Sequence, residues 1–313
     1  MLVGSLSLNT KLVFADPLTT TLAPTRPRSV AAFTSVWAGA GSFAGFAYVD
    51  GEAITHAKSD FERDREMALR VFVHGVPETT VVWETLREGV EGPSVSLALP
   101  GFGNPLPSGF LPTKDQYASW LTGELKKVEG PIDLVGHDWG ALLVLRMATA
   151  GDVRLRSWIC DVGSVFHPDY VWHPWAATVI TPGQGEYMLL RRRQSSPEEA
   201  VAMMLGGGVS ARDASEVFAA HDEVMSRCIL GLYRSAVPNV AADWGADGYA
   251  PTSAPGMILL PTGDQLDDGA LSREVAGWLG ARTEVLDGLS HWWMYDQTGK
   301  AASVLEKFWA ALE

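Results

Sequence analysis

An aspartate occupies the position in this sequence where a turn between a strand and a helix would display a nucleophile. Gly136-His137-Asp138-Trp139-Gly140 follows one apolar run and precedes a second apolar run with helical spacing. Small residues on both sides of Asp138 permit a strained turn that lifts its side chain above a sheet. A carboxylate in such a turn attacks a saturated carbon and forms an ester with it. The expected substrates therefore carry an electrophilic tetrahedral carbon, such as an epoxide or an alkyl halide.

Hydrolysis of that ester needs a base, and His291 is the best-placed histidine because it follows the last predicted strand. An imidazole with a pKa of roughly 6.5 accepts a proton from water at neutral pH. The expected orienting carboxylate is Asp264, which ends an apolar run 27 residues before His291 (291 − 264 = 27). One helix and one strand fit in that interval. Three other acids remain alternatives for this role, namely Asp267, Asp268 and Asp161.

When water attacks the ester, a negative oxygen develops and must be met by N–H donors. The loop His74-Gly75-Val76-Pro77-Glu78 follows a predicted strand and offers the Val76 amide. The Trp139 amide, at the start of the helix behind Asp138, is the second expected donor. Pro77 permits a cis peptide in this loop.

The elements that position these residues are those of an α/β fold with a mostly parallel, doubly wound sheet. Short apolar runs alternate with helical patterns, which predicts helices on both faces of the sheet. The expected strands are Leu69–Val73, Val95–Leu99, Ile132–Val135, Ser157–Asp161, Met257–Leu260 and Thr283–Leu286. The expected helices are Val81–Arg87, Lys114–Lys126, Ala141–Ala150, Leu271–Leu279 and Ala301–Leu312.

Between Asp161 and Met257 the alternation fails for about 90 residues, too long for a structureless loop in a compact domain. The sequence therefore predicts a helical cap at residues 166–250, inserted between core segments 29–165 and 251–313. Asp50-Gly51 predicts a hairpin turn near the start of the core. Residues 1–28 are expected to form a loosely ordered tail.

Composition restricts the class of protein. A chain of 313 residues that is 47% hydrophobic is long enough for one domain with an insertion. Its formal net charge of −13 would repel phosphate backbones, so nucleic acid is not an expected partner. Cys160 and Cys228 cannot form a disulfide framework, which favours a cytoplasmic location. The uncharged segment 29–49 is too rich in Gly, Ser and Thr to favour a membrane span. No metal or organic cofactor is expected, and a homodimer stays open.

Three motifs in order, at residues 74–78, 99–103 and 136–140, resemble those of the epoxide hydrolases of the α/β-hydrolase superfamily. The haloalkane dehalogenases are the next nearest family. The resemblance runs from about residue 44 to the C-terminus and is weaker in the cap. It implies the α/β-hydrolase fold, an Asp138-His291-Asp264 triad and no cofactor.

Two features favour the epoxide hydrolases over the dehalogenases. Dehalogenases commonly have asparagine after the His-Gly pair, where this chain has Val76. Leu232-Tyr233-Arg234 is similar to the segment in which a cap tyrosine of epoxide hydrolases protonates the opening ring. The resemblance implies a second tyrosine donor, with Tyr187 preferred to Tyr170. The remaining residues expected to bind substrate are His74, Pro77, Tyr170, Trp172 and Trp292.

The resulting hypothesis is a hydrolase that opens small hydrophobic epoxides to vicinal diols through an ester on Asp138. Two alternatives stay open. A haloalkane dehalogenase would use the same triad, and the stretches 172–174 and 181–186 are similar to some dehalogenase-like sequences. A catalytically silent small-molecule-binding protein would keep the fold without the chemistry.

Overall fold

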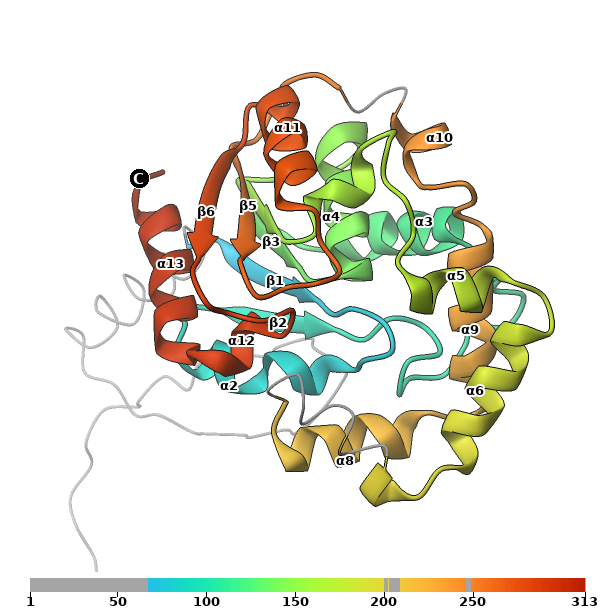
Figure 1. Cartoon of the computed structure of the whole chain (residues 1–313). Helices are drawn as coiled ribbons and strands as arrows, with labels where there is room; N and C mark the ends of the chain where they lie inside the picture. The colour runs from blue at the N-terminus through green and yellow to red at the C-terminus, as the bar shows by residue number, and fades with distance from the viewer. Residues whose placement is uncertain (1–66, 200–201, 203–208, 246–248, 313) are drawn as a thin grey trace, which may run out of the picture. The chain divides into compact units, whose positions relative to one another are not determined.

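A six-stranded parallel sheet forms the centre of the part of the chain that the structure describes (Figure 1). The computed structural model describes residues 67–199, 202, 209–245 and 249–312. The strand order is β2-β1-β3-β4-β5-β6. Their bounds are β1 (Leu69–Val73), β2 (Ser94–Leu97), β3 (Ile132–Gly136), β4 (Ser157–Cys160), β5 (Gly256–Pro261) and β6 (Arg282–Leu286). The predicted α/β-hydrolase fold class is confirmed, and each predicted strand overlaps an observed one.

The order of strand addition reverses at β1, which pairs with β2 on one side and with β3 on the other. In parallel sheets of this kind, ligands bind at the carboxyl ends of the strands beside such a reversal. The loop after β1 and the turn after β3 therefore meet at one edge of the sheet. Those are the segments that carry Val76 and Asp138.

The sheet is covered on both faces, so that every residue of its central strands β3 and β4 and of β5 is buried. In β1, Val71 and Val73 contribute to one hydrophobic cluster and Phe72 to the other. The same alternation continues through β3, β4 and β5, since successive side chains of a strand point to opposite faces. Helices α3 (Lys114–Leu125), α4 (Trp139–Ala150) and α11 (Gly269–Leu279) cover the first face. Helices α2 (Glu84–Glu88) and α13 (Thr298–Ala310) cover the second (Figure 1).

The helices begin and end at residues suited to those positions. The Thr113 side chain accepts a hydrogen bond from Gln116 N at the start of α3, and Asp268 caps α11 in the same way. Gly151 and Gly280 end α4 and α11 in the left-handed conformation that glycine adopts without strain. The core helices predicted from sequence are therefore confirmed, with shifts of a few residues at their ends.

The described part of the long connection between β4 and β5 contains a 3-10 turn and several helices. They are η2 (Gly163–Phe166), α5 (Pro174–Ile180), α6 (Gln184–Gln194), α8 (Ala211–Ala220), α9 (Glu223–Arg234) and α10 (Ala241–Trp244) among the described residues. Helix α9 packs against α5, α6 and α3. The remaining short elements are η1 (Thr80–Trp83) and α12 (Trp293–Asp296).

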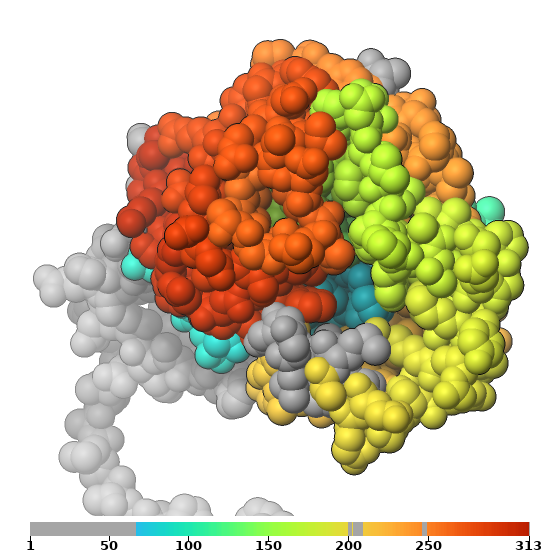
Figure 2. All heavy atoms as spheres, in the orientation of Figure 1, coloured from blue at the N-terminus to red at the C-terminus, as the bar shows by residue number. Residues whose placement is uncertain are grey.

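Figure 2 shows a hollow between the red and orange C-terminal segments and the yellow-green helices of this connection. Atoms from the blue start of the described chain are visible at its base. The hollow therefore lies between the carboxyl side of the sheet and the helices that follow β4.

Several predictions from sequence fall outside the described residues, namely the tail at 1–28, the uncharged segment 29–49 and the hairpin at Asp50-Gly51. Within the described ranges, no helix combines the length and apolarity required to cross a membrane. Cys160 and Cys228 are both free and buried.

Glycine is required where α4 leaves the sheet. A Cβ on Gly140 would lie 2.1 Å from the Val73 carbonyl oxygen, and one on Gly136 would lie 2.4 Å from the Gly140 carbonyl oxygen. Neither backbone atom can move away without shifting a strand or the helix. The two glycines thus let α4 begin directly against β1 and β3.

We expect Gly140→Ala to lower the free energy of unfolding by at least about 2 kcal/mol, because the added methyl overpacks a backbone contact. Gly123→Ala is the matched control, since Gly123 lies inside α3 with nothing within 4 Å of its Cβ position. The control should stabilise the protein by about 0.5–1 kcal/mol through helix propensity alone. Urea unfolding of both variants measures the difference, and equal stability of the two would contradict this account.

Candidate active site

Asp138 stands in a strained turn between β3 and α4. Its φ of 49° and ψ of −120° lie outside the regions that non-glycine residues normally adopt. The Asp138 amide donates a 2.9 Å hydrogen bond to Oδ1 of Asp161, which follows β4. The turn is therefore held from the neighbouring strand as well as by the glycines on either side.

The Asp138 carboxylate has one oxygen bound and one available. Val76 N donates a 2.7 Å hydrogen bond to Oδ1, so the predicted oxyanion loop reaches the carboxylate. The other oxygen, Oδ2, lies 3.9 Å from Nε2 of His291. Trp139 is the first residue of α4, where backbone N–H groups have no partner within the helix. The peptide bond between Val76 and Pro77 is cis, as the sequence permits.

His291 is oriented by Asp264. The two side chains meet through a 2.8 Å hydrogen bond between His291 Nδ1 and Asp264 Oδ2. The other oxygen of Asp264 accepts a 2.7 Å hydrogen bond from Leu266 N, which fixes the carboxylate. The structure therefore brings together Asp138, His291 and Asp264, as the sequence predicts.

The three alternative acids have other partners. Asp267 is held by the hydroxyls of Ser164 and Ser272, and Asp268 caps α11. Asp161 binds the Nδ1 atom of His137 at 2.5 Å. Among these candidates, only Asp264 contacts His291 in the described structure.

Burial and neighbouring charges set the protonation of the triad. Burial raises the pKa of Asp138 to about 6, although the charges of His291 and His137 act in the opposite direction. Burial and the charge of His137 lower the pKa of His291, but its hydrogen bond to Asp264 and the charges of Asp264 and Asp138 outweigh them and raise it. Burial opposes ionisation of Asp264, yet the hydrogen bond from His291 leaves its pKa lowered. Asp138 thus becomes ionised only as the pH approaches neutrality.

A small cavity lies over Asp138 and places two tyrosines beside it. It is lined by Asp138, Trp139, Leu142, Val162, Val165, Tyr170, Trp172, His173, Tyr233 and Leu266. Tyr170 and Tyr233 are 7% and 2% exposed, and burial followed by the charge of Asp138 raises the pKa of both phenols. Both phenols therefore stay protonated at neutral pH.

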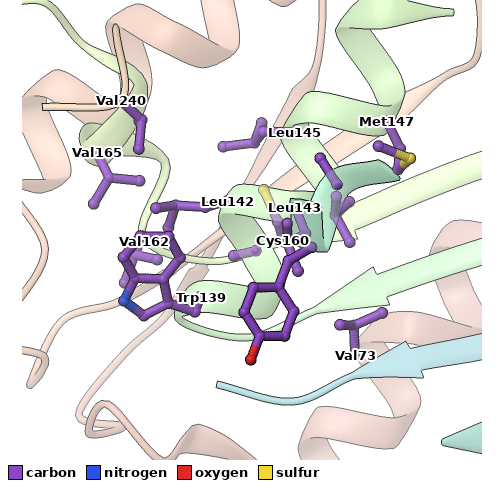
Figure 3. Close-up of a cluster of buried hydrophobic side chains, with 14 of the residues drawn as sticks. Val73, Trp139, Leu142, Leu143, Leu145, Met147, Cys160, Val162, Val165 and Val240 are labelled. Carbon is purple, nitrogen blue, oxygen red and sulfur yellow. The ribbon is translucent and has the colours of Figure 1, made fainter. Parts of the chain in front are cut away.

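Apolar side chains form one wall of this cavity. Figure 3 shows Trp139 and Leu142 of α4 beside Val162 and Val165. Trp139 also stacks on Trp172 with ring centroids 6.1 Å apart and meets Tyr233 edge to face at 5.0 Å. The free space between these side chains is small.

Four residues expected at the site are placed elsewhere. Tyr187 is 64% exposed on α6 and does not line the cavity, which leaves Tyr170 as the tyrosine opposite Tyr233. His74 is fully buried, where it accepts a hydrogen bond from Leu99 N and donates one to the Gly75 carbonyl. Pro77 and Trp292 are not among the residues around the cavity, and Trp292 Nε1 instead donates to Glu78 at 2.6 Å.

Two residues near the reacting groups are not predicted from the sequence. His173 precedes α5 and lines the cavity, where burial lowers its pKa to about 4 and keeps it neutral. Glu78 ends the oxyanion loop and accepts a 2.9 Å hydrogen bond from Gly75 N. The signal available in the sequence was the place of Glu78 directly after Pro77 in the predicted oxyanion loop. An acid that is buried in such a loop needs a hydrogen-bond partner.

Comparison with known proteins agrees with this geometry. The model of the alpha/beta hydrolase family matches residues 71–303, and the chain belongs to this family. No curated protein matches its sequence.

Solved structures with the same fold include two haloalkane dehalogenases and one epoxide hydrolase. Dehalogenase DatA from Agrobacterium tumefaciens is 17% identical, with 79% of this chain and 91% of that chain covered and a TM-score of 0.64. Dehalogenase DbeA from Bradyrhizobium elkani is 19% identical, with 78% and 90% covered and a TM-score of 0.61. An epoxide hydrolase from Vigna radiata is 16% identical, with 79% and 92% covered and a TM-score of 0.62. At such identities the likeness establishes the fold alone.

The raised pKa of Asp138 predicts that its charge destabilises the folded protein. The pKa rises from 3.8 to about 6 on folding. The destabilisation is therefore absent at low pH and grows to about 2–3 kcal/mol as the pH rises between these two values. Asp138→Asn should therefore increase the free energy of unfolding above neutral pH, and the gain should shrink on acidification. The exposed Asp152→Asn variant is the control, expected within about 0.5 kcal/mol of wild type at every pH. A gain in Asp138→Asn that does not change with pH would contradict the assignment.

Proposed function

We propose that this protein is an epoxide hydrolase that uses Asp138 as its nucleophile. The observation that carries the proposal is the placement of two protonated phenols, Tyr170 and Tyr233, in the same cavity as the Asp138 carboxylate. An epoxide oxygen leaves as an alkoxide and needs an acid to receive it. A halide leaving group needs no acid.

In the first step, Oδ2 of Asp138 attacks one carbon of the ring and the bond from that carbon to the epoxide oxygen breaks. Oδ2 is the free oxygen, because Oδ1 already accepts from Val76 N. The released oxygen takes a proton from Tyr170 or Tyr233. The product is an ester between Asp138 and a carbon that now has a hydroxyl group beside it.

In the second step, His291 takes a proton from water and the resulting hydroxide attacks the ester carbonyl carbon. Negative charge then develops on Oδ1, where the Val76 N–H already points. The bond between the carbonyl carbon and the diol oxygen breaks, and protonated His291 returns a proton to that oxygen. Asp138 is released as a carboxylic acid, and its proton goes to the phenolate, which restores both the carboxylate and the tyrosine. Asp264 stabilises the imidazolium through its hydrogen bond to Nδ1.

The dehalogenase alternative rests on the two tryptophans in the cavity, since indole N–H groups can hold a halide ion. In this structure the Trp172 indole has another partner, since its Nε1 donates to the Ala236 carbonyl at 3.3 Å. The Trp139 ring packs edge to face against Tyr233. The bond of Trp172 favours oxygen chemistry over halide release at this site.

Intact-protein mass spectrometry of His291→Ala tests the proposal, because loss of the base leaves the ester without activated water. We expect an adduct with the full mass of an epoxide after exposure to a panel of small apolar epoxides. An adduct that lacks the halogen, formed from a panel of alkyl halides, would establish dehalogenation instead. If neither panel gives an adduct, the protein is a binding protein without this chemistry.

The tyrosines have a separate test. Single-turnover ring opening in Tyr170→Phe and Tyr233→Phe should slow by a factor of about 100 or more each, the usual contribution of a positioned acid. The control is Tyr249→Phe, since Tyr249 is 42% exposed and outside the cavity. Rates unchanged in both cavity variants would remove the observation on which the epoxide assignment depends.

A further inference from the structure

A buried histidine that the proposed reaction does not use lies directly beside the triad. His137 precedes the nucleophile, is fully buried and lies between two carboxylates that are themselves almost completely buried. Its Nδ1 atom is 2.5 Å from Asp161 Oδ2 and its Nε2 atom is 3.3 Å from Glu78 Oε1. Nδ1 is hydrogen-bonded to Asp161, whereas Nε2 makes no hydrogen bond to the described residues and lies only within ion-pair distance of Glu78. A buried ring with a carboxylate near each nitrogen is in surroundings that favour a positive charge on it.

The two carboxylates connect this ring to all three segments that carry the proposed reaction. Asp161 also accepts from the Asp138 amide at 2.9 Å and from Trp293 Nε1 at 2.6 Å. Glu78 also accepts from Gly75 N at 2.9 Å and from Trp292 Nε1 at 2.6 Å. The nucleophile turn, the oxyanion loop and the loop of His291 are therefore bound to one ion cluster, which we define as Glu78, His137 and Asp161.

The cluster also lies against the base. The centroids of the His137 and His291 rings are 4.5 Å apart, with the planes tilted by 52°. The ionisable groups facing His137 come from several elements, and they are Glu78, Asp138, Asp161, Asp264, His74 and His291. A positive charge this close to His291 opposes a second positive charge on that ring.

We infer that His137 is a positioning residue held as an imidazolium, which fixes the three segments and opposes a second positive charge on the neighbouring His291. This inference rests on the proposed function only in taking His291 as the base.

The groups around His137 favour its protonated form. Burial alone would lower the pKa of His137, but the charges of Asp161 and Glu78 and the hydrogen bond to Asp161 raise it well above its ordinary value. Burial likewise opposes ionisation of Glu78, and the charge of His137 lowers the pKa of Glu78 to about 2. The two partners thus support each other's charged forms.

The first experiment needs no substrate and no variant. Nitrogen-15 NMR of the imidazole side chains follows each histidine of the wild-type protein through a pH titration. We expect one buried imidazolium that persists beyond about pH 8, well above the ordinary histidine value of roughly 6.5. A His137 that is neutral at neutral pH would overturn the inference.

The second experiment removes the charge. In His137→Gln, the pKa of His291 measured by the same method should rise by about one unit or more, because a positive neighbour is lost while Glu78 and Asp161 remain. The matched control is Trp293→Phe, which removes a neutral hydrogen bond to Asp161 and leaves every charge in place. The control should leave the His291 midpoint unchanged, whatever its effect on stability.

If the pKa of His291 moves equally in His137→Gln and Trp293→Phe, or in neither variant, the cluster has only a structural role and the inference is contradicted. If His137→Gln does not fold, Glu78→Gln tests the same charge balance, since loss of Glu78 should lower the pKa of His137 in the NMR titration. Neither readout requires epoxide turnover. Failure of the inference is therefore distinguishable from failure of the proposed function, which the adduct experiment addresses.

Discussion

The conformation of Asp138 is the constraint on which the rest of the site depends. A non-glycine residue at positive φ costs about 1–3 kcal/mol and persists only where the surroundings force it. Here Gly136 and Gly140 let α4 start against the sheet, and Asp161 accepts the Asp138 amide. The strain places one carboxylate oxygen on the Val76 amide and the other toward His291. The fold thus supplies the placement of Asp138 on which the proposed reaction depends.

The protonation of the acids in the site follows from the same placement of Asp138 at the sheet edge. Several buried acids gather at the carboxyl ends of β1, β3, β4 and β5. Asp264 is hydrogen-bonded to His291, and Glu78 and Asp161 share His137. Asp138 is left without a dedicated cation, so burial raises its pKa to about 6. A weakly stabilised carboxylate is a better nucleophile than one held in a salt bridge, which relates the cost in stability to the proposed reaction.

The triad was predictable because its members stand at strand ends, and parallel topology brings strand ends to one edge of the sheet. The cap was less predictable, since its helices have no such rule to orient them. Tyr187 is an example of a cap residue whose orientation could not be predicted. The buried residues of α6 are Gly185 and Leu189, one turn apart, and Tyr187 lies between them in sequence and on the opposite face of the helix. The sequence assigns no role to His137, because its partners, Glu78 and Asp161, are distant in sequence. Contacts of that kind depend on register and packing that no local pattern encodes.

The most direct test of a covalent ester on Asp138 is a single turnover of a small epoxide in oxygen-18 water. Water attacks the ester carbonyl in this mechanism, so the heavy oxygen should appear in the Asp138 carboxylate, and the first diol released should contain none. Mass analysis of the peptide that contains Asp138, together with the diol, gives both readings from one sample. Heavy oxygen in the first diol with an unlabelled Asp138 would mean that water attacks the epoxide directly, and would contradict the nucleophilic role assigned to Asp138.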